Sequence, residues 1–79
     1  RMQNPLTEKQ RSVLLYVIHF KKENGFPPTM HEIKDEFGWA SANASHQHLR
    51  AIAKKGYLAM AEGKKSRGIK VLRRIRETA

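Results

Sequence analysis

The sequence has no cysteine among its 79 residues, which excludes a disulfide framework, a thiolate metal site and a cysteine nucleophile. Its longest uninterrupted apolar stretch, residues 13–18, is far too short to cross a membrane, and no secretory signal is recognisable. A chain of this length forms one small domain, residues 1–79, whose core depends on a few large apolar side chains. We therefore expect a cytoplasmic protein.

Acidic residues are few: the chain has 7 Asp and Glu against 16 Lys and Arg, which gives a formal net charge of +9. Residues 1–40 carry six basic and five acidic side chains, a net of +1, whereas residues 41–79 carry ten and two, a net of +8. A charge that only served solubility would be spread evenly, so the asymmetry predicts one face that meets a polyanion. Nucleic acid is the first candidate and an anionic membrane surface is the second.

Two capping boxes predict the starts of the first two helices. In each box, a threonine is followed three residues later by a glutamine or glutamate that reaches back to the threonine's backbone N–H. The boxes are Thr7-Glu8-Lys9-Gln10 and Thr29-Met30-His31-Glu32. They predict helices over about 8–24 and about 30–37. The segment Gly25 to Pro28 breaks the chain between the helices, and Gly38 ends the second.

A third helix is predicted over about 42–55, after a turn so short that helix-turn-helix geometry follows. We expect the Ser41 hydroxyl to cap its start and Gly56 to close its end. Its apolar side carries Ser45, Leu49, Ile52 and Ala53. Its other side is polar, lacks carboxylates and carries Asn43, Gln47, Arg50 and Lys54, with His46 at the edge. Because Asn, Gln and Arg pair bidentately with base edges in the major groove, this pattern predicts a recognition helix.

After Gly56 the apolar residues no longer follow the helical spacing. Residues 57–60 and 69–72 are short strand candidates, and the polar loop between them is rich in lysine and glycine. These features predict a β-hairpin wing over about 57–72, followed by a basic tail, residues 73–79, that frays. The predicted fold is thus mainly α with a small β-hairpin, a winged helix-turn-helix of three helices and a two-stranded wing.

These motifs together resemble the N-terminal DNA-binding domain of the LexA repressor family over nearly the whole chain. The matching pieces are Leu6-Thr7 with Gln10, Gly25-Phe26-Pro27-Pro28-Thr29, Glu32-Ile33, Gly38-Trp39, Ser41-x-Asn43-Ala44, His48-Leu49-Arg50-Ala51, Lys55-Gly56 and Ser66-Arg67-Gly68-Ile69. Each piece alone is weak, but their order and spacing are specific.

The resemblance implies a transcriptional repressor domain of the SOS response that reads half-sites of an inverted repeat in double-stranded DNA. By position, the implied base contacts are Ser41, Asn43, Ala44, His46 and Gln47. We also expect Arg50 to contact bases, because its guanidinium group can pair bidentately with guanine. Two departures stand out: Ala42 replaces a frequent proline, and His46 and Gln47 replace two glutamates of the best-known members. Since Glu accepts from cytosine whereas Gln pairs with adenine, we expect a half-site other than the usual CTGT-like sequence.

Phosphate contacts are expected from Lys54, Lys64, Lys65, Ser66 and Arg67. They would give affinity without sequence information. The alternative for the helix is an ordinary solvated face, and the alternative for the wing lysines is protection of a sheet edge. We expect a dimer, formed on DNA or through a missing domain. The chain has no Ala-Gly dipeptide like the family's self-cleavage site, so it is expected to be either an excised domain or a short relative from a phage or mobile element.

Neither catalysis nor a cofactor is predicted. His46 and His48 are two residues apart on a helix and point in nearly opposite directions, so they cannot share a metal ion. No serine has an evident His–Asp partnership, and the domain is too small to form a deep substrate pocket. The alternative function is a winged-helix interaction module that docks an acidic protein or another regulator.

Overall fold

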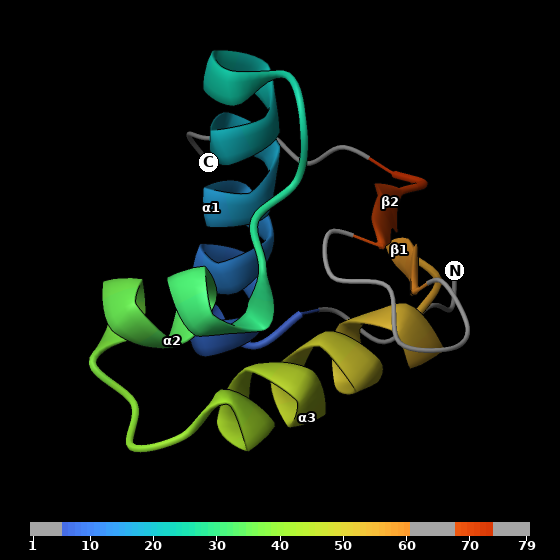
Figure 1. Ribbon diagram of the computed structural model, residues 1–79. Helices are drawn as coiled ribbons and strands as arrows, with labels where there is room; N and C mark the ends of the chain where they lie inside the picture. Colours follow the sequence, from blue (N-terminus) through green and yellow to red (C-terminus); the bar gives the residue numbers. More distant parts are fainter. Residues whose placement is uncertain (1–5, 61–67, 74–79) are drawn as a thin grey trace.

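The computed structural model describes residues 6–60 and 68–73, which form three helices followed by two short strands (Figure 1). The elements are α1 (Glu8–Asn24), α2 (Met30–Phe37), α3 (Ala42–Lys54), β1 (Leu58–Met60) and β2 (Ile69–Val71). This architecture confirms the predicted winged helix-turn-helix class. No helix in the described part of the chain is long and apolar enough to cross a membrane.

Both predicted capping boxes are formed. At the start of α1, Thr7 Oγ1 accepts from the Gln10 backbone N–H and Gln10 Oε1 accepts from the Thr7 N–H, both at 3.1 Å. At the start of α2, the corresponding distances between Thr29 and Glu32 are 3.1 and 2.8 Å. Each box satisfies two backbone groups that a helix start leaves without an intrahelical partner.

The start of α3 differs from the prediction. Ser41 does occupy the N-cap position with an extended backbone, but its side chain makes no capping hydrogen bond. Its carbonyl instead accepts from the Ala44 backbone N–H at 3.1 Å, a tight first turn that leaves the hydroxyl exposed. At the other end the helix stops at Lys54, and Gly56 has the expected left-handed conformation, with φ at 88°.

The core lies where the three helices meet the inner face of the hairpin. Its buried apolar side chains come from every element: Val13, Leu14, Val17, Ile33, Leu49, Ile52, Leu58 and Ile69. Ile18, Met30, Phe37 and Trp39 are partly buried and pack against this cluster. A domain this small depends on each of these groups, because the fraction of its surface that it can bury is low.

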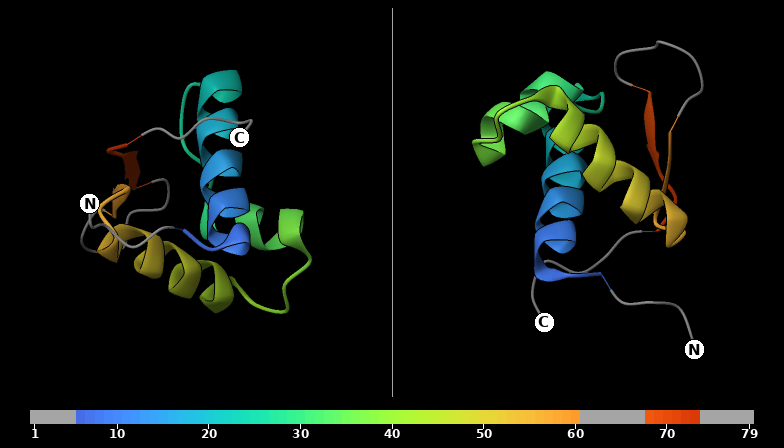
Figure 2. Two further views of the ribbon diagram at one scale, coloured as in Figure 1. Left: turned by 180° about the vertical axis from the view of Figure 1, so that it is seen from behind. Right: turned by 90° about the horizontal axis from the view of Figure 1, so that it is seen from below.

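The strands pair antiparallel, with Leu58 opposite Val71 and Met60 opposite Ile69. Leu58 and Ile69 face the core, and the Tyr57 carbonyl accepts from the Leu72 and Arg73 N–H groups at 2.9 and 3.0 Å. In Figure 2, α3 lies across α1 and the strands stand near the C-terminal end of α3. Each strand is one residue shorter than predicted. The expected wing tip (61–67) lies outside the described residues, as does the tail beyond residue 73.

Candidate DNA-binding surface

Helix α3 separates its side chains into a buried row and an exposed polar row. Ser45, Leu49 and Ile52 are buried. The exposed residues from the N-cap onward are Ser41, Asn43, His46, Gln47, Arg50 and Lys54. Asn43, Gln47, Arg50 and Lys54 follow one another at intervals of three or four residues and therefore lie along one side of the helix. The polar residues expected to contact bases thus stand exposed on α3, with Ala44 half-buried among them.

Negative charge is kept off this helix. Helix α3 contains no carboxylate, whereas α2 carries Glu32, Asp35 and Glu36. The α2 carboxylates act on Tyr16 of α1: burial chiefly, and these three charges in addition, raise the pKa of the Tyr16 hydroxyl. Acidic charge is therefore placed near α1, whereas the exposed row of α3 carries hydrogen-bond donors and cations.

Hydrogen bonds attach α3 and the residue that follows it to the other helices. The buried Ser45 Oγ donates to the Met30 carbonyl oxygen at 2.9 Å, linking α3 to the first turn of α2. Just beyond the C-terminal end of α3, Lys55 Nζ donates to Gln10 Oε1 at 2.8 Å. That oxygen also accepts from the Thr7 N–H, so one side chain caps α1 and holds the residue that follows α3.

Aromatic rings connect the helix-turn-helix to α1. The Trp39 ring, in the turn before α3, stacks on His48 with centroids 4.4 Å apart and planes 10° apart. Its other neighbour is Phe37 at 5.1 Å and 19°. Phe37 in turn meets Tyr16 of α1 edge-on at 5.8 Å. Trp39 packs against the core cluster, as expected for a residue in a turn between packed helices.

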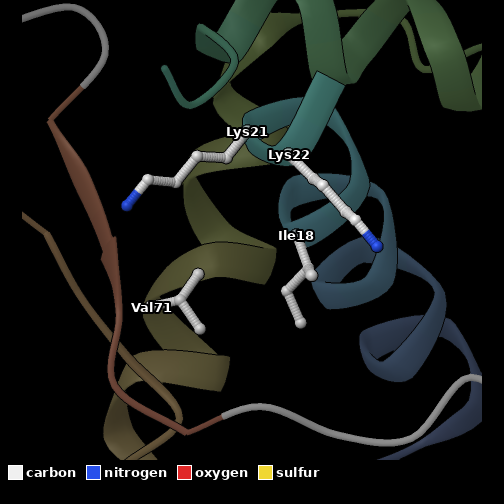
Figure 3. A pocket seen from close by; sticks show the side chains of 4 residues that line it. All are labelled: Ile18, Lys21, Lys22 and Val71. Carbon is white, nitrogen blue, oxygen red and sulfur yellow. The ribbon is translucent and has the colours of Figure 1, made fainter. Parts of the chain in front are cut away.

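Among the hollows on the described surface, one lies beside α3 and one lies between α1 and β2. A shallow one of about 270 Å³ adjoins the exposed row of α3 and is lined by Gln10, Ala44, Gln47, His48 and Ala51. The other, of about 400 Å³, lies between α1 and β2, where Ile18 and Val71 face each other below Lys21 and Lys22 (Figure 3). None of its described lining residues belongs to α3. Of these two hollows, the first belongs to the candidate DNA-binding surface.

The described residues contain no group of three or more His, Asp or Glu side chains that could hold a metal ion. His46 is exposed whereas His48 is half-buried against Trp39, which agrees with the opposite directions expected for them. The remaining predicted phosphate contacts, Lys64, Lys65, Ser66 and Arg67, lie outside the described residues.

Comparison with known proteins decides the family, because residues 3–68 match the family described as LexA DNA binding domain. The chain belongs to this family. It is a DNA-binding domain of a repressor family, which confirms the resemblance and the expectation of sequence-specific DNA binding.

Three similar proteins of this family are LexA repressors. That of Leptospira interrogans is 50% identical over 68 residues, covering 86% of this chain and 32% of the relative. That of Desulfatibacillum aliphaticivorans is 44% identical over 68 residues, covering 86% and 33%. That of Actinobacillus pleuropneumoniae is 45% identical over 74 residues, covering 94% and 35%. The chain therefore spans about a third of the length of these curated relatives.

Sequence reasoning missed two features of this LexA-family surface. The Lys55–Gln10 hydrogen bond joins residues 45 positions apart, and no local pattern indicates such a pairing. The Trp39–His48 stack is also absent from the predictions. The sequence does contain a signal for this stack. An aromatic residue lies in the turn, and a histidine lies on the inner edge of the next helix, so their rings can come into contact.

Proposed function

We propose that the exposed row of α3 enters the major groove of double-stranded DNA and reads the bases of a half-site. The observation that carries this proposal is the exposed row itself: amide, imidazole and guanidinium donors on one helix without a carboxylate. The chain's membership of the LexA DNA-binding family supports the same reading. A helix is the element that fits the width of the B-DNA major groove.

Each side chain has a proposed role that follows from its hydrogen-bonding groups. Asn43 and Gln47 carry an amide that accepts and donates together, which suits the N6 and N7 atoms of adenine. Arg50 offers paired donors for O6 and N7 of guanine, and His46 donates to guanine. Ser41, with its exposed hydroxyl, and Ala44, with its methyl group, complete the contact surface. Ala44 suits the methyl group of thymine.

Phosphate contacts are proposed to flank this reading surface. Lys54 is exposed one turn beyond Arg50, where its ammonium group can reach the DNA backbone. Lys64, Lys65, Ser66 and Arg67 are assigned to the wing by position in the sequence. These contacts release counterions and give affinity that falls with salt but carries no base information.

We further propose that two copies bind the half-sites of an inverted repeat. A single domain of this size offers a small interface and binds weakly alone. Joining two such interfaces raises affinity without any new base contact. The pairing occurs on DNA or through a missing domain. We place this bacterial or phage protein in the cytoplasm, associated with the nucleoid.

Selection of binding sequences from a randomised duplex library at moderate salt tests the proposal. We expect an enriched inverted repeat with fixed spacing, whose half-site departs from CTGT because Gln47 and His46 replace glutamates. The enriched positions would also report the number of base pairs that each copy reads. Recovery of no preferred sequence, with binding that disappears as salt rises, would reduce the basic surface to an electrostatic anchor.

The alternative, a module that docks an acidic protein, finds less support. Protein-docking helices usually present exposed large apolar side chains. Among the described residues, the exposed large hydrophobic side chains are Phe26 and Leu72, and neither lies on α3. A complex with an acidic protein that requires Gln47 and excludes DNA would favour this alternative.

A further inference from the structure

The N-terminal half of α3 carries most of the proposed base contacts, so the contacts that fix its direction decide how those side chains are presented. Ser41 makes no side-chain capping hydrogen bond. The first buried attachment in this helix is Ser45, whose hydroxyl donates to the Met30 carbonyl oxygen at 2.9 Å. This hydrogen bond alone does not fix the tilt of the helix start. A second attachment, one turn further along the helix, restrains both its tilt and its rotation.

The stack of His48 on Trp39 supplies this second attachment. The two rings lie 4.4 Å apart and 10° from parallel, a separation at which they touch across their faces. Trp39 lies in the turn, so the contact joins the middle of α3 to the segment just before its start. His48 is also adjacent to Gln47 and lines the same hollow as Gln47 and Ala44.

Trp39 is itself held by a series of rings that reaches α1. Phe37, at the end of α2, stacks on Trp39 at 5.1 Å, and Tyr16 meets Phe37 edge-on at 5.8 Å. Face-to-face and edge-on contacts of this kind each add stability beyond the area they bury. The His48 ring is thus connected, through Trp39 and Phe37, to α1, the longest helix in the described part of the chain.

We infer that His48 is a positioning residue for DNA reading, which fixes the base-contacting half of α3 through its stack on Trp39. This inference rests on the proposed function of α3. His48 itself needs no contact with DNA. Its ring holds the backbone beside it so that Gln47 and Asn43 present their amides at the depth and angle that the bases require. A small error in such placement removes base contacts more than phosphate contacts, because bidentate pairing tolerates little displacement.

Three substitutions of His48 separate positioning from direct contact. His48→Ala removes the stack and should weaken binding to the preferred duplex about threefold to tenfold, the equivalent of one aromatic pair. Binding to a scrambled duplex should change less than twofold. His48→Phe keeps a flat ring but has no hydrogen-bond donor, and it should restore most of the preference. His48→Gln keeps a donor without a ring and should resemble His48→Ala.

Three results would overturn the inference. If His48→Gln bound like the wild type while His48→Phe lost preference, the imidazole would act by donating to DNA. If His48→Ala weakened both duplexes equally, or neither, the stack would have no part in base reading. Thermal unfolding of each variant, run in parallel, confirms that binding is compared between folded proteins.

The stack can also be tested without DNA, because Trp39 is the sole tryptophan of the chain. Loss of the His48 ring exposes more of the indole, so the emission maximum of His48→Ala should move to longer wavelength. His46→Ala, which removes an exposed histidine two residues earlier, should leave the emission unchanged. Identical emission of His48→Ala and wild type would refute the stack. A wild-type protein without any preferred sequence would refute the proposed function while leaving this result in place.

Discussion

Ser45→Ala is the substitution that most sharply tests how α2 and α3 are joined. Ser45 is completely buried, and its hydroxyl donates to the Met30 carbonyl oxygen at 2.9 Å. Alanine keeps the Cβ and removes only the hydroxyl, so the cavity it leaves is small. The change therefore isolates one long-range hydrogen bond between the two helices of the helix-turn-helix.

The expected cost follows from the groups involved. A buried hydrogen bond contributes about 0.5–1.5 kcal/mol net. The Met30 carbonyl lies in the first turn of α2 and keeps its helical partner, so it is not left unsatisfied. Alanine regains part of the loss, because it is a better helix former than serine by up to about 0.5 kcal/mol. Ser12→Ala is the matched control, since Ser12 is an exposed serine within α1.

The difference between the two variants removes the helix-propensity gain and leaves the hydrogen bond. We expect Ser45→Ala to be less stable than Ser12→Ala by about 1 kcal/mol, which lowers the Tm by about 4–8 °C in a domain of this size. Thermal and urea unfolding followed by circular dichroism measure this difference. Equal stability of the two variants would show that the Ser45–Met30 hydrogen bond does not join α2 to α3.

Three further predictions concern a cap, a charge and a titration. Thr29→Ala removes the capping oxygen of α2 and should cost about 1 kcal/mol in urea unfolding. Lys54→Ala should lower the slope of log affinity against log salt by about 0.9, whereas Lys22→Ala, on the hollow between α1 and β2, should not. The pKa of Tyr16 is raised from 10.0 by burial and then by α2 carboxylates. Because the folded state favours the neutral hydroxyl, Tyr16 makes a stabilising contribution to the free energy of unfolding. This contribution is present below pH 10 and is lost as the pH rises through the raised pKa. When the free energy of unfolding is measured with urea from pH 8 to 11, Tyr16→Phe should lack this pH-dependent contribution.

Each of these has an outcome that contradicts it. Wild-type stability of Thr29→Ala would mean that the α2 capping box contributes nothing measurable. Equal salt slopes for Lys54→Ala and wild type would remove Lys54 from the phosphate contacts. If Tyr16→Phe lost stability above pH 10 as steeply as the wild type, Tyr16 would not be the group that titrates.

The sequence predicts best those features that depend on a few consecutive residues. The threonine boxes and the glycine stops are local, so their pattern is enough to predict the starts and ends of α1 and α2. At the start of α3, the local residue pattern does not determine the capping hydrogen bond. Serine is a favoured cap, but the tight turn at Ala44 leaves the Ser41 hydroxyl without its capping bond. Side-chain rotation at an exposed position is not determined by residue type.

The exposed row of α3 follows from helical spacing, because the buried positions Leu49 and Ile52 fix which side faces outward. The attachments of α3 do not follow from spacing. The Lys55–Gln10 bond and the Trp39–His48 stack depend on how α1, the turn and α3 meet in space. The sequence therefore predicts which residues of α3 are exposed, whereas the structure is needed to identify the contacts that hold them.

The central claim is that individual side chains of α3 read individual bases, and repeating the duplex selection with Gln47→Ala tests it most directly. We predict that the variant still enriches an inverted repeat with the same spacing, but loses preference at one position in each half-site and keeps it elsewhere. Recovery of the wild-type motif, unchanged at every position, would contradict the assignment of α3 as the helix that reads DNA through Gln47.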